Sequence, residues 1–306
     1  MDKFADIEAF TAVVEAGTFS AAGERLGVAK SVVSRRVSQL EGRLGSRLLH
    51  RTTRRLALTD AGKNFYQRAV QILADLDDAE QGVTEQATEL RGPLKLAAPL
   101  SFGLLHLSAA IVDFLSEHPA IELNIDLNDR NINLVEEGFD MAVRIGELQD
   151  STLVARRIGT MRSVTCASPA YLEQHGEPAH PDELHQHIGM QYSNISYKQQ
   201  WRYQTPGGKM IFAQPQIRIR ANNGEALAAA AIAGLGITRA PTFIVGRHLK
   251  EGSLVSILNE YQHASVGIYA VYPPGRLLPR RIQVFTDSLA GRFGEQPYWD
   301  EGLRLS

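Results

Sequence analysis

The sequence predicts a protein that is α/β overall and built in three parts: an N-terminal all-α domain, a long linker helix and a two-lobed α/β region. Three observations lead to this prediction. Nine basic side chains and one acid lie between Arg25 and Arg55, although the whole chain carries a net charge of -2. An apolar stripe at heptad spacing follows, and beyond it strand and helix patterns alternate, as they do in layered α/β folds.

The expected boundaries follow changes in charge. Residues 1–63 carry 11 basic and 7 acidic side chains, residues 64–91 carry 2 and 6, and residues 92–306 carry 19 and 21. We expect the helical domain at 1–58, the linker helix at 59–91 and the α/β region at 92–306. Within that region, the first lobe is expected at 92–162 plus 266–295 and the second at 163–265.

The composition is ordinary for a soluble globular chain, with 44% hydrophobic and 22% charged residues. No apolar run approaches the roughly 20 residues that a membrane span needs, and the N-terminus lacks the apolar stretch of a secretory signal. The single cysteine, Cys166, cannot form an intrachain disulfide, which fits a reducing compartment. We therefore expect a cytoplasmic protein that does not associate with a membrane.

Three helices are expected in the N-terminal domain. The first spans 2–16 on the helical spacing of its apolar residues and ends at Gly17. The second is short, begins at the N-cap Ser20 and runs to Leu26, after which Gly27 permits a tight turn. The third spans 30–44 and carries an apolar stripe of Val33, Val37, Leu40 and Leu44. Two short helices joined by such a turn are typical of a helix-turn-helix.

The exposed side of the third helix carries short polar and basic side chains, namely Lys30, Ser31, Ser34, Arg35 and Ser38. Such a helix is slim enough for a major groove, and these side chains can donate to base edges and phosphates. The alternative is an ordinary solvated surface, which the concentration of basic residues disfavours. The sequence therefore predicts a double-stranded DNA-binding face.

Two short apolar segments within 48–59 flank a basic turn, so this stretch is expected to form a β-hairpin beside the helices. Its Arg51, Arg54 and Arg55 could reach phosphates or an adjacent minor groove. A solvated basic loop explains the same residues equally well.

A long linker helix is expected after Thr59, which is suited to cap it. Its apolar stripe consists of Phe65, Ala69, Ile72, Leu76, Ala79, Val83 and Leu90, and the sequence Arg91-Gly92-Pro93 ends the helix. A heptad stripe indicates a coiled-coil seam with the same helix of a second subunit. The alternative is that the stripe docks on its own domain.

The N-terminal 91 residues resemble the winged helix-turn-helix and linker helix of the LysR-type transcriptional regulators. The resemblance rests on GTFSAAGERL from Gly17, GVAKSVVSR from Gly27, and on Leu40-Glu41, Leu44-Gly45, Leu48-Leu49 and Arg51-Thr52-Thr53-Arg54. Gly23 departs from the alanine usual in the family, and Lys30 stands where glutamine is frequent. The resemblance implies operator DNA as a partner, a homodimer through the linker helix and a homotetramer through the regulatory domains. It also implies contact with RNA polymerase if the protein is an activator.

Strands and helices alternate in the C-terminal region and predict a mainly parallel, doubly wound sheet in each lobe. Expected strands are 94–99, 121–127, 141–145, 217–221, 236–239 and 266–272, with a hairpin pairing 200–203 and 209–212. Expected helices are 101–118, 134–137, 225–233, 242–248 and 279–293. The family resemblance implies a regulatory domain like a periplasmic solute-binding protein, with a small-molecule effector between the lobes.

The expected effector residues are Ser101, Phe102, Arg144, Tyr197, Asn222, Asn223 and Phe243. Ser101 and Asn223 open helices whose N-termini suit a carboxylate, and Arg144 could bind the same group bidentately. Each has a structural alternative: capping for Ser101 and Asn223, and an internal ion pair for Arg144. Trp201 is expected in the core rather than in the pocket.

Catalytic and metal-binding motifs are missing from the sequence. It has no Walker loop, dinucleotide fingerprint or Gly-x-Ser-x-Gly elbow, and the histidines between His175 and His187 lack a zinc-site spacing. We expect no cofactor, no metal and no enzymatic activity. Two alternatives remain: an enzyme with an appended DNA-binding module, and an architectural DNA-binding protein that ignores ligands.

Overall fold

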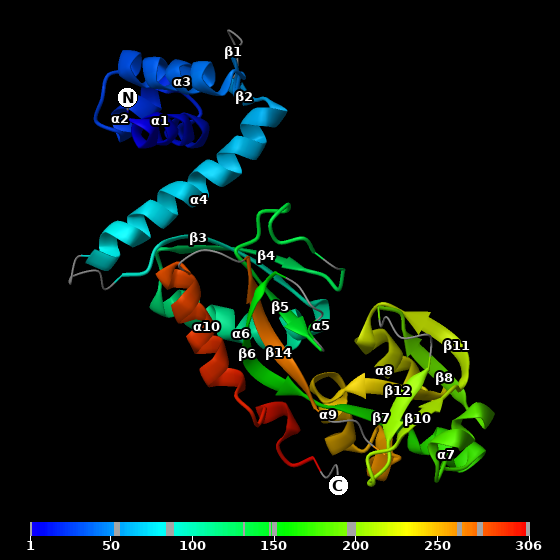
Figure 1. Cartoon of the computed structure of the whole chain (residues 1–306). Helices are drawn as coiled ribbons and strands as arrows, with labels where there is room; N and C mark the ends of the chain where they lie inside the picture. The colour runs from blue at the N-terminus through cyan, green and yellow to red at the C-terminus, as the bar shows by residue number, and fades with distance from the viewer. Residues whose placement is uncertain are drawn as a thin grey trace. The chain divides into compact units, whose positions relative to one another are not determined.

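The computed structural model describes residues 2–51, 56–83, 89–130, 132–146, 148, 152–194, 200–261, 265–273 and 278–303. The chain forms two compact units. The first contains Met1–Leu94, Ala120–Glu122 and Pro279–Arg281, and the second contains Lys95–Pro119, Leu123–Leu278 and Ile282–Ser306. Figure 1 shows the order of the elements along both units.

The first unit begins with the three predicted helices, α1 (Lys3–Ala16), α2 (Phe19–Arg25) and α3 (Lys30–Leu44). The Asp2 carboxylate caps α1 by accepting from the backbone N–H groups of Phe4 and Ala5. One expected cap is wrong: Thr18, not Ser20, caps α2, because its hydroxyl accepts from the N–H of Ala21 at 3.1 Å. The helix therefore starts two residues earlier than a cap at Ser20 predicted.

The core of this domain is apolar and comes from all three helices and the segment after them. Its buried members are Ala9, Phe10, Ala12, Val13, Ala22, Val33, Val37, Leu40, Leu48 and Leu49. Three of the four residues of the predicted α3 stripe are therefore buried. The fourth, Leu44, is 43% exposed, so the predicted stripe does not extend to it. Leu44 lies in the last turn of α3, beyond the core.

The predicted hairpin is confirmed as β1 (Leu49–Arg51) paired antiparallel with β2 (Leu56–Leu58). Glu41 is the one acid of the basic segment. Its carboxylate fixes the start of the hairpin by accepting from the N–H groups of Leu48 and Leu49 at 2.9 and 3.1 Å. The turn residues Arg54 and Arg55 lie outside the described residues.

Helix α4 (Asp60–Val83) begins where Thr59 was expected to cap it, with the Thr59 hydroxyl accepting from the N–H of Gly62 at 2.9 Å. The predicted extent to residue 91 is wrong, because residues 89–91 are not helical. Leu90 is therefore not a member of a helical stripe. It is buried nevertheless.

The first part of α4 docks on its own domain, as the alternative interpretation of the stripe proposed. The ring of Phe10 lies 5.6 Å from that of Phe65 and 6.4 Å from that of Tyr66, centroid to centroid. Further along, Ile72 is 38% exposed. The stripe is thus divided: its start completes the helical domain, and Ile72 remains available to a partner.

The second unit contains most of two five-stranded sheets. One has the order β4-β3-β5-β14-β6, with β3 (Gly92–Ala98), β4 (Ile121–Leu127), β5 (Met141–Ile145), β6 (Val154–Met161) and β14 (Val266–Tyr272). Its helices are α5 (Leu100–Phe102), the π-helix η1 (Gly103–Leu107), α6 (Ser108–Glu117) and α10 (Arg280–Phe293). The return of the chain through β14 and α10 to this first lobe is confirmed.

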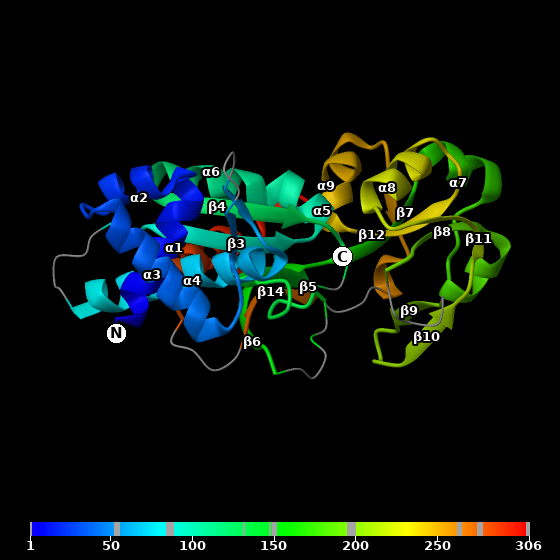
Figure 2. The ribbon, with the colours of Figure 1, turned by 90° about the horizontal axis from the view of Figure 1, so that it is seen from above.

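The other sheet has the order β11-β8-β12-β7-β13, with β7 (Ser163–Ala167), β8 (Ile188–Tyr192), β11 (Gln216–Ala221), β12 (Ile237–Pro241) and β13 (Val255–Ile257). Helices α8 (Gly224–Ile232) and α9 (Thr242–Glu251) lie on one side of it, as Figure 2 shows. The other face packs against α7 (Pro169–His175), the 3-10 helix η2 (Pro181–Gln186) and the hairpin of β9 (Trp201–Gln204) and β10 (Met210–Ala213).

Both sheets are mixed, so the prediction of mainly parallel sheets is wrong. Among the described strand pairs, β3/β5, β8/β11 and β8/β12 are parallel, whereas β5/β14, β6/β14, β7/β12 and β7/β13 are antiparallel. The cause is that β14 and β7 run antiparallel to the strands beside them, and the sequence analysis missed β6 and β13, which pair with β14 and β7. The short helix expected at 134–137 is a turn instead.

The helical stretch Leu100–Glu117 is long and apolar enough, by length and composition, to cross a membrane. Close to half of it, 44%, is buried within the unit, as in a core helix. Ser101 and His106 are among its buried residues, and both make hydrogen bonds to groups on other elements. This stretch is therefore interpreted as a core element of the first lobe.

Candidate DNA interface and regulatory site

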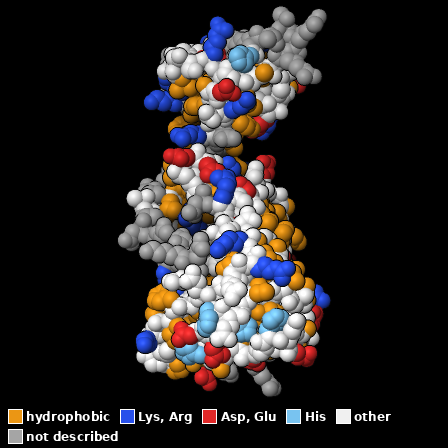
Figure 3. Space-filling model, turned by 90° about the vertical axis from the view of Figure 1, so that its right-hand side faces the viewer, with side chains coloured by type: hydrophobic (Ala, Val, Ile, Leu, Met, Phe, Trp, Pro, Cys, Tyr) orange, Lys and Arg blue, Asp and Glu red, His pale blue; other side chains and the backbone are white. Residues whose placement is uncertain are grey.

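The predicted DNA-facing side of α3 is exposed along its length. Lys30, Ser31, Arg35 and Ser38 are exposed and Ser34 is half-buried, whereas the opposite side of the helix is buried in the domain core. Several Lys and Arg side chains project from the N-terminal unit in Figure 3. An exposed helix with short polar side chains meets the steric requirement for entry into a major groove.

Two of the nine basic residues are paired with acids of the same domain. Arg43 pairs with Asp6 of α1 at 3.0 Å, and the Asp6 carboxylate is almost fully buried. Arg25 pairs with Glu15 at 2.6 Å, and both side chains keep contact with solvent. The Arg43–Asp6 pair joins the last turn of α3 to α1 and so orients the exposed side of α3. The charge offered to DNA is accordingly smaller than the sequence count suggested.

The turn between α2 and α3 passes very close to Gly23, the residue where alanine is usual in the family. A Cβ atom at Gly23 would lie 2.7 Å from the carbonyl oxygen of Val28 and 3.3 Å from the backbone nitrogen of Lys30. The N–H of Val28 donates to the carbonyl of Gly23 at 2.9 Å. The departure from the family pattern thus permits a closer turn, with Lys30 directly after it.

Arg51 belongs to β1, whereas Arg54 and Arg55 fall in the part of the chain that is not described. Their contact with DNA stays a prediction.

A polar junction between the two lobes brings together residues far apart in sequence. The buried Ser101 hydroxyl donates to the Glu225 carboxylate at 2.9 Å and accepts from the Asn223 amide at 3.3 Å. Asn223 also caps α8, since its side-chain oxygen accepts from the N–H of Ala226 at 2.9 Å. The capping alternative therefore holds for Asn223, and Ser101 links the lobes.

Glu225 was missed by the sequence analysis. Its position in the first turn of α8, two residues after the Asn223 cap, was the available signal, because an acid is favoured there by the helix dipole. Asp129 similarly accepts from the N–H of Leu100 at 3.1 Å, at the start of α5. Carboxylates of the protein thus already occupy the positions at which the sequence suggested an effector carboxylate.

Two residues that the sequence analysis expected to bind the effector, Phe102 and Phe243, lie in the core instead. Phe102 and Phe243 stack edge to face at 5.4 Å, and both pack against His106 and Trp299. Both are buried, because four rings pack around each other there. The expectation that Trp201 lies in the core is confirmed by its burial. Asn222 is exposed, and Tyr197 lies outside the described residues.

His106 is held at the centre of this aromatic cluster. One ring nitrogen lies 2.6 Å from the Tyr298 hydroxyl and the other lies 3.0 Å from the carbonyl oxygen of Phe243. Burial lowers the pKa of His106, and the hydrogen bond to the Phe243 carbonyl opposes that shift. The neutral ring is therefore favoured.

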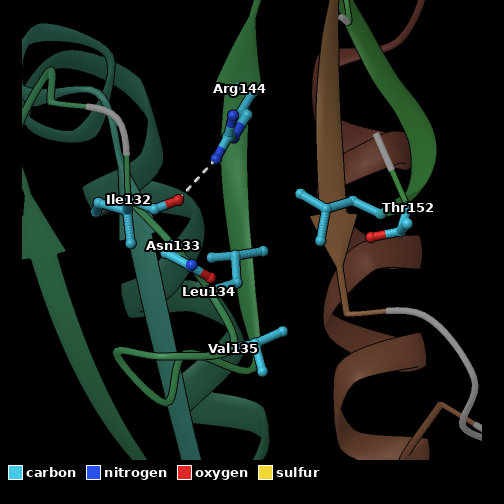
Figure 4. A pocket seen from close by; sticks show the side chains of 7 residues that line it. Ile132, Asn133, Leu134, Val135, Arg144 and Thr152 are labelled. Carbon is cyan, nitrogen blue, oxygen red and sulfur yellow. Dashed lines mark hydrogen bonds between the residues drawn. The ribbon is translucent and has the colours of Figure 1, made fainter. Parts of the chain in front are cut away.

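Arg144 lies apart from the Ser101 junction, in a pocket of the first lobe (Figure 4). Its Nη2 donates to the carbonyl oxygen of Ile132 at 2.9 Å, and among the described residues no acid pairs with Arg144, so the alternative of an internal ion pair is not supported. The pocket has a volume of about 420 Å³ and is lined by Ile132, Asn133, Leu134, Val135, Arg144, Thr152 and Leu153.

Comparison with known proteins matches both units. Residues 4–63 match the family model described as bacterial regulatory helix-turn-helix protein, lysR family, and residues 87–294 match the LysR substrate binding domain. An uncharacterized HTH-type transcriptional regulator of Haemophilus influenzae is 40% identical over 285 residues, 92% of this chain and 98% of the relative. The transcriptional activator AaeR of Escherichia coli is 32% identical over 295 residues, 96% of this chain and 95% of the relative.

Solved structures give the same result. The chain is similar to CrgA of Neisseria meningitidis, with 32% identity, 95% and 99% of the two chains covered and a TM-score of 0.61. It is also similar to the Vibrio cholerae virulence activator AphB, with 28% identity, 96% and 100% covered and a TM-score of 0.58.

Proposed function

Because the chain belongs to the LysR-type transcriptional regulators, we propose that α3 inserts its exposed side into the major groove of an operator. The protein is a DNA-binding transcriptional regulator with an effector-binding domain, and its relatives are regulators rather than enzymes. The contacts assigned to α3 come from Lys30, Ser31, Ser34, Arg35 and Ser38. Arg51, Arg54 and Arg55 of the wing complete the interface at phosphates or in the minor groove.

The observation that carries this proposal is the division of α3 into two faces. Val33, Val37 and Leu40 are buried in the core, and the Arg43–Asp6 pair fixes the last turn. The opposite face therefore keeps a constant orientation, and pre-oriented donors lose little entropy when they bind a base or phosphate.

Arg35→Ala tests the assignment on an operator fragment selected from a random DNA library with the unmodified protein. We expect about tenfold weaker binding or more, since one base-reading arginine contributes roughly 1–3 kcal/mol. If Arg35 contacts phosphate instead, the slope of log affinity against log salt should fall by about 0.9. Arg247→Ala on α9, an exposed helical arginine paired with Glu251, is the matched control and should change neither quantity. Unchanged affinity and slope for Arg35→Ala would remove Arg35 from the interface.

For regulation, we place the effector at the Ser101 junction between the lobes. The Ser101–Glu225 bond must rearrange when a ligand enters, so a ligand that prefers one arrangement shifts the population. Because Glu225 and Asp129 already supply carboxylates there, an effector with hydrogen-bond donors fits better than a second carboxylate. We further propose that the protein is cytoplasmic, that it dimerises through α4 and that the regulatory domains pair to form a tetramer. If it is an activator, it also contacts RNA polymerase.

A further inference from the structure

We propose that the C-terminal segment 297–303, which contains the 3-10 helix η4 (Tyr298–Asp300), is a clasp that fixes the angle between the two lobes. The chain crosses between the lobes after β6 and again after β13, and such crossings form a hinge about which lobes can close. The clasp is a further connection between them. Figure 1 shows the chain running from the end of α10 toward α9. The proposal goes beyond the effector site, because the clasp acts whether or not a ligand is bound.

The ring of Trp299 packs against both lobes. It is buried, and its centroid lies 4.5 Å from that of His106 and 5.9 Å from that of Phe102, both in the first lobe. It also lies 6.3 Å from the ring of Phe243, which belongs to α9 in the second lobe. Closely packed rings do not deform, so a change in the lobe angle must pull one of these contacts apart.

A chain of hydrogen bonds joins the clasp to both lobes through His106. The backbone carbonyl of Phe243 can only accept, so Nε2 of His106 carries the proton that it donates to this oxygen at 3.0 Å. In the neutral ring, Nδ1 then accepts from the Tyr298 hydroxyl at 2.6 Å. One imidazole of the first lobe thus holds both the clasp and α9.

The clasp also contacts the backbone of α9 and the hinge. A Cβ atom at Gly246 of α9 would lie 3.1 Å from the carbonyl oxygen of Trp299, so a larger residue at this position pushes the clasp away. The Asp300 carboxylate lies 3.6 Å from Nε of Arg162, which is the residue between β6 and β7. The clasp therefore reaches the point at which the chain first crosses between the lobes.

The clasp is held less firmly than its aromatic packing alone would hold it. Among the described residues, Nε1 of Trp299 and both carboxylate oxygens of Asp300 are buried without a hydrogen bond. Buried polar groups without hydrogen bonds lower the stability of the segment that carries them. We therefore expect the clasp to detach more readily than the sheets unfold. A ligand that changes the lobe angle must supply the free energy of this detachment by its differential affinity.

The distance between two spin labels tests the clasp in the full-length protein, without ligand or DNA. Glu117→Cys on α6 and Glu173→Cys on α7 place one label on an exposed position of each lobe. The native Cys166 stays in place, because it is fully buried and burial raises the pKa of its thiol to about 12. An excess of unlabelled protein ensures that the measured distances lie within one chain.

Trp299→Ala should broaden the distance distribution by about twofold or more, since it removes the ring that contacts both lobes. Gly246→Val should also broaden it while every aromatic residue of the cluster remains, because the new side chain displaces the Trp299 carbonyl. Gly291→Val on α10 is the matched control, since there is open space around Gly291, and the width should not change.

An unchanged width in Trp299→Ala overturns the clasp, and so does equal broadening in Gly291→Val. If Trp299→Ala does not fold, Gly246→Val decides in its place, and an unchanged width in that variant overturns the clasp. None of these outcomes depends on effector or operator binding, so failure of the clasp leaves the proposed function intact.

Discussion

The buried arginine of the first unit offers the sharpest test of how this unit is held together. Arg281 has a fully buried side chain, and its Nε donates to the Pro93 carbonyl at 2.9 Å. Its Nη2 donates to the Asp75 carboxylate at 3.2 Å, so one guanidinium joins the start of α10 to β3 and α4. Arg281→Met keeps an unbranched apolar chain but removes the charge and the guanidinium donors.

The expected cost follows from burial. Removing one partner of a buried ion pair costs about 3–5 kcal/mol, because the other charge stays behind without its counterion. The Asp75 side chain is 28% exposed and so keeps part of its hydration, which puts the expected loss near the lower end, about 3 kcal/mol. For a unit of this size, about 100 residues, that corresponds to a fall in Tm of roughly 12–24 °C.

Thermal unfolding followed by circular dichroism measures this loss. Arg25→Met is the matched control in the same unit, because the Arg25–Glu15 side chains are 60% and 32% exposed and such pairs contribute only about 0–1 kcal/mol. The double variant Asp75→Asn/Arg281→Met should recover part of the loss, since it also removes the charge that faced the guanidinium. Equal shifts for Arg281→Met and Arg25→Met would refute the reasoning.

Three further predictions concern the helix turn, the buried histidine and the dimer. Gly23→Ala should lower Tm and weaken operator binding, because the new Cβ would lie 2.7 Å from a backbone oxygen of the turn. Gly42→Ala is the control: there is open space around Gly42, and alanine favours a helix more than glycine does, so Tm should rise slightly. Burial lowers the pKa of His106 and of His187 in the folded state, so the unfolded chain binds protons at a higher pH than the folded chain. The free energy of unfolding should therefore fall as the pH drops below about 6.5. When Tm is measured from about pH 8 to about pH 5, the fall should be smaller in His106→Leu than in the unmodified protein. Ile72→Asp should shift the dimer to monomer in sedimentation; an undiminished dimer would contradict the α4 seam.

The N-terminal domain could be predicted closely because its signals are local. Helix α3 spans Lys30–Leu44 as expected, since an apolar stripe and a following glycine specify a helix within a few turns. The Thr59 cap was found for the same reason. The wrong cap at Ser20 arose because Thr18, two residues earlier, offers an equivalent hydroxyl, and only the backbone geometry decides between them.

The sheets and the regulatory site were less predictable. Strand β8 carries no polar alternation because it is central and covered on both faces, and β13 has only three residues. The absence of β13 and β6 from the prediction hid the antiparallel pairs β7/β13 and β6/β14. Phe102 and Phe243 were expected at the effector site because sequence position cannot show that their rings stack on each other.

The sequence by itself determined the class of this protein: a helix-turn-helix with a basic exposed face, a linker helix and a two-lobed α/β region. Those features depend on spacing within a few residues. Tertiary structure alone decided that Ser101 meets Glu225, 124 residues away, and that Arg144 faces a separate pocket. It also decided that Arg43 and Arg281 hold the fold. The physical reason is that a side chain's partner is set by chain folding across long separations, and periodicity carries no information about those contacts.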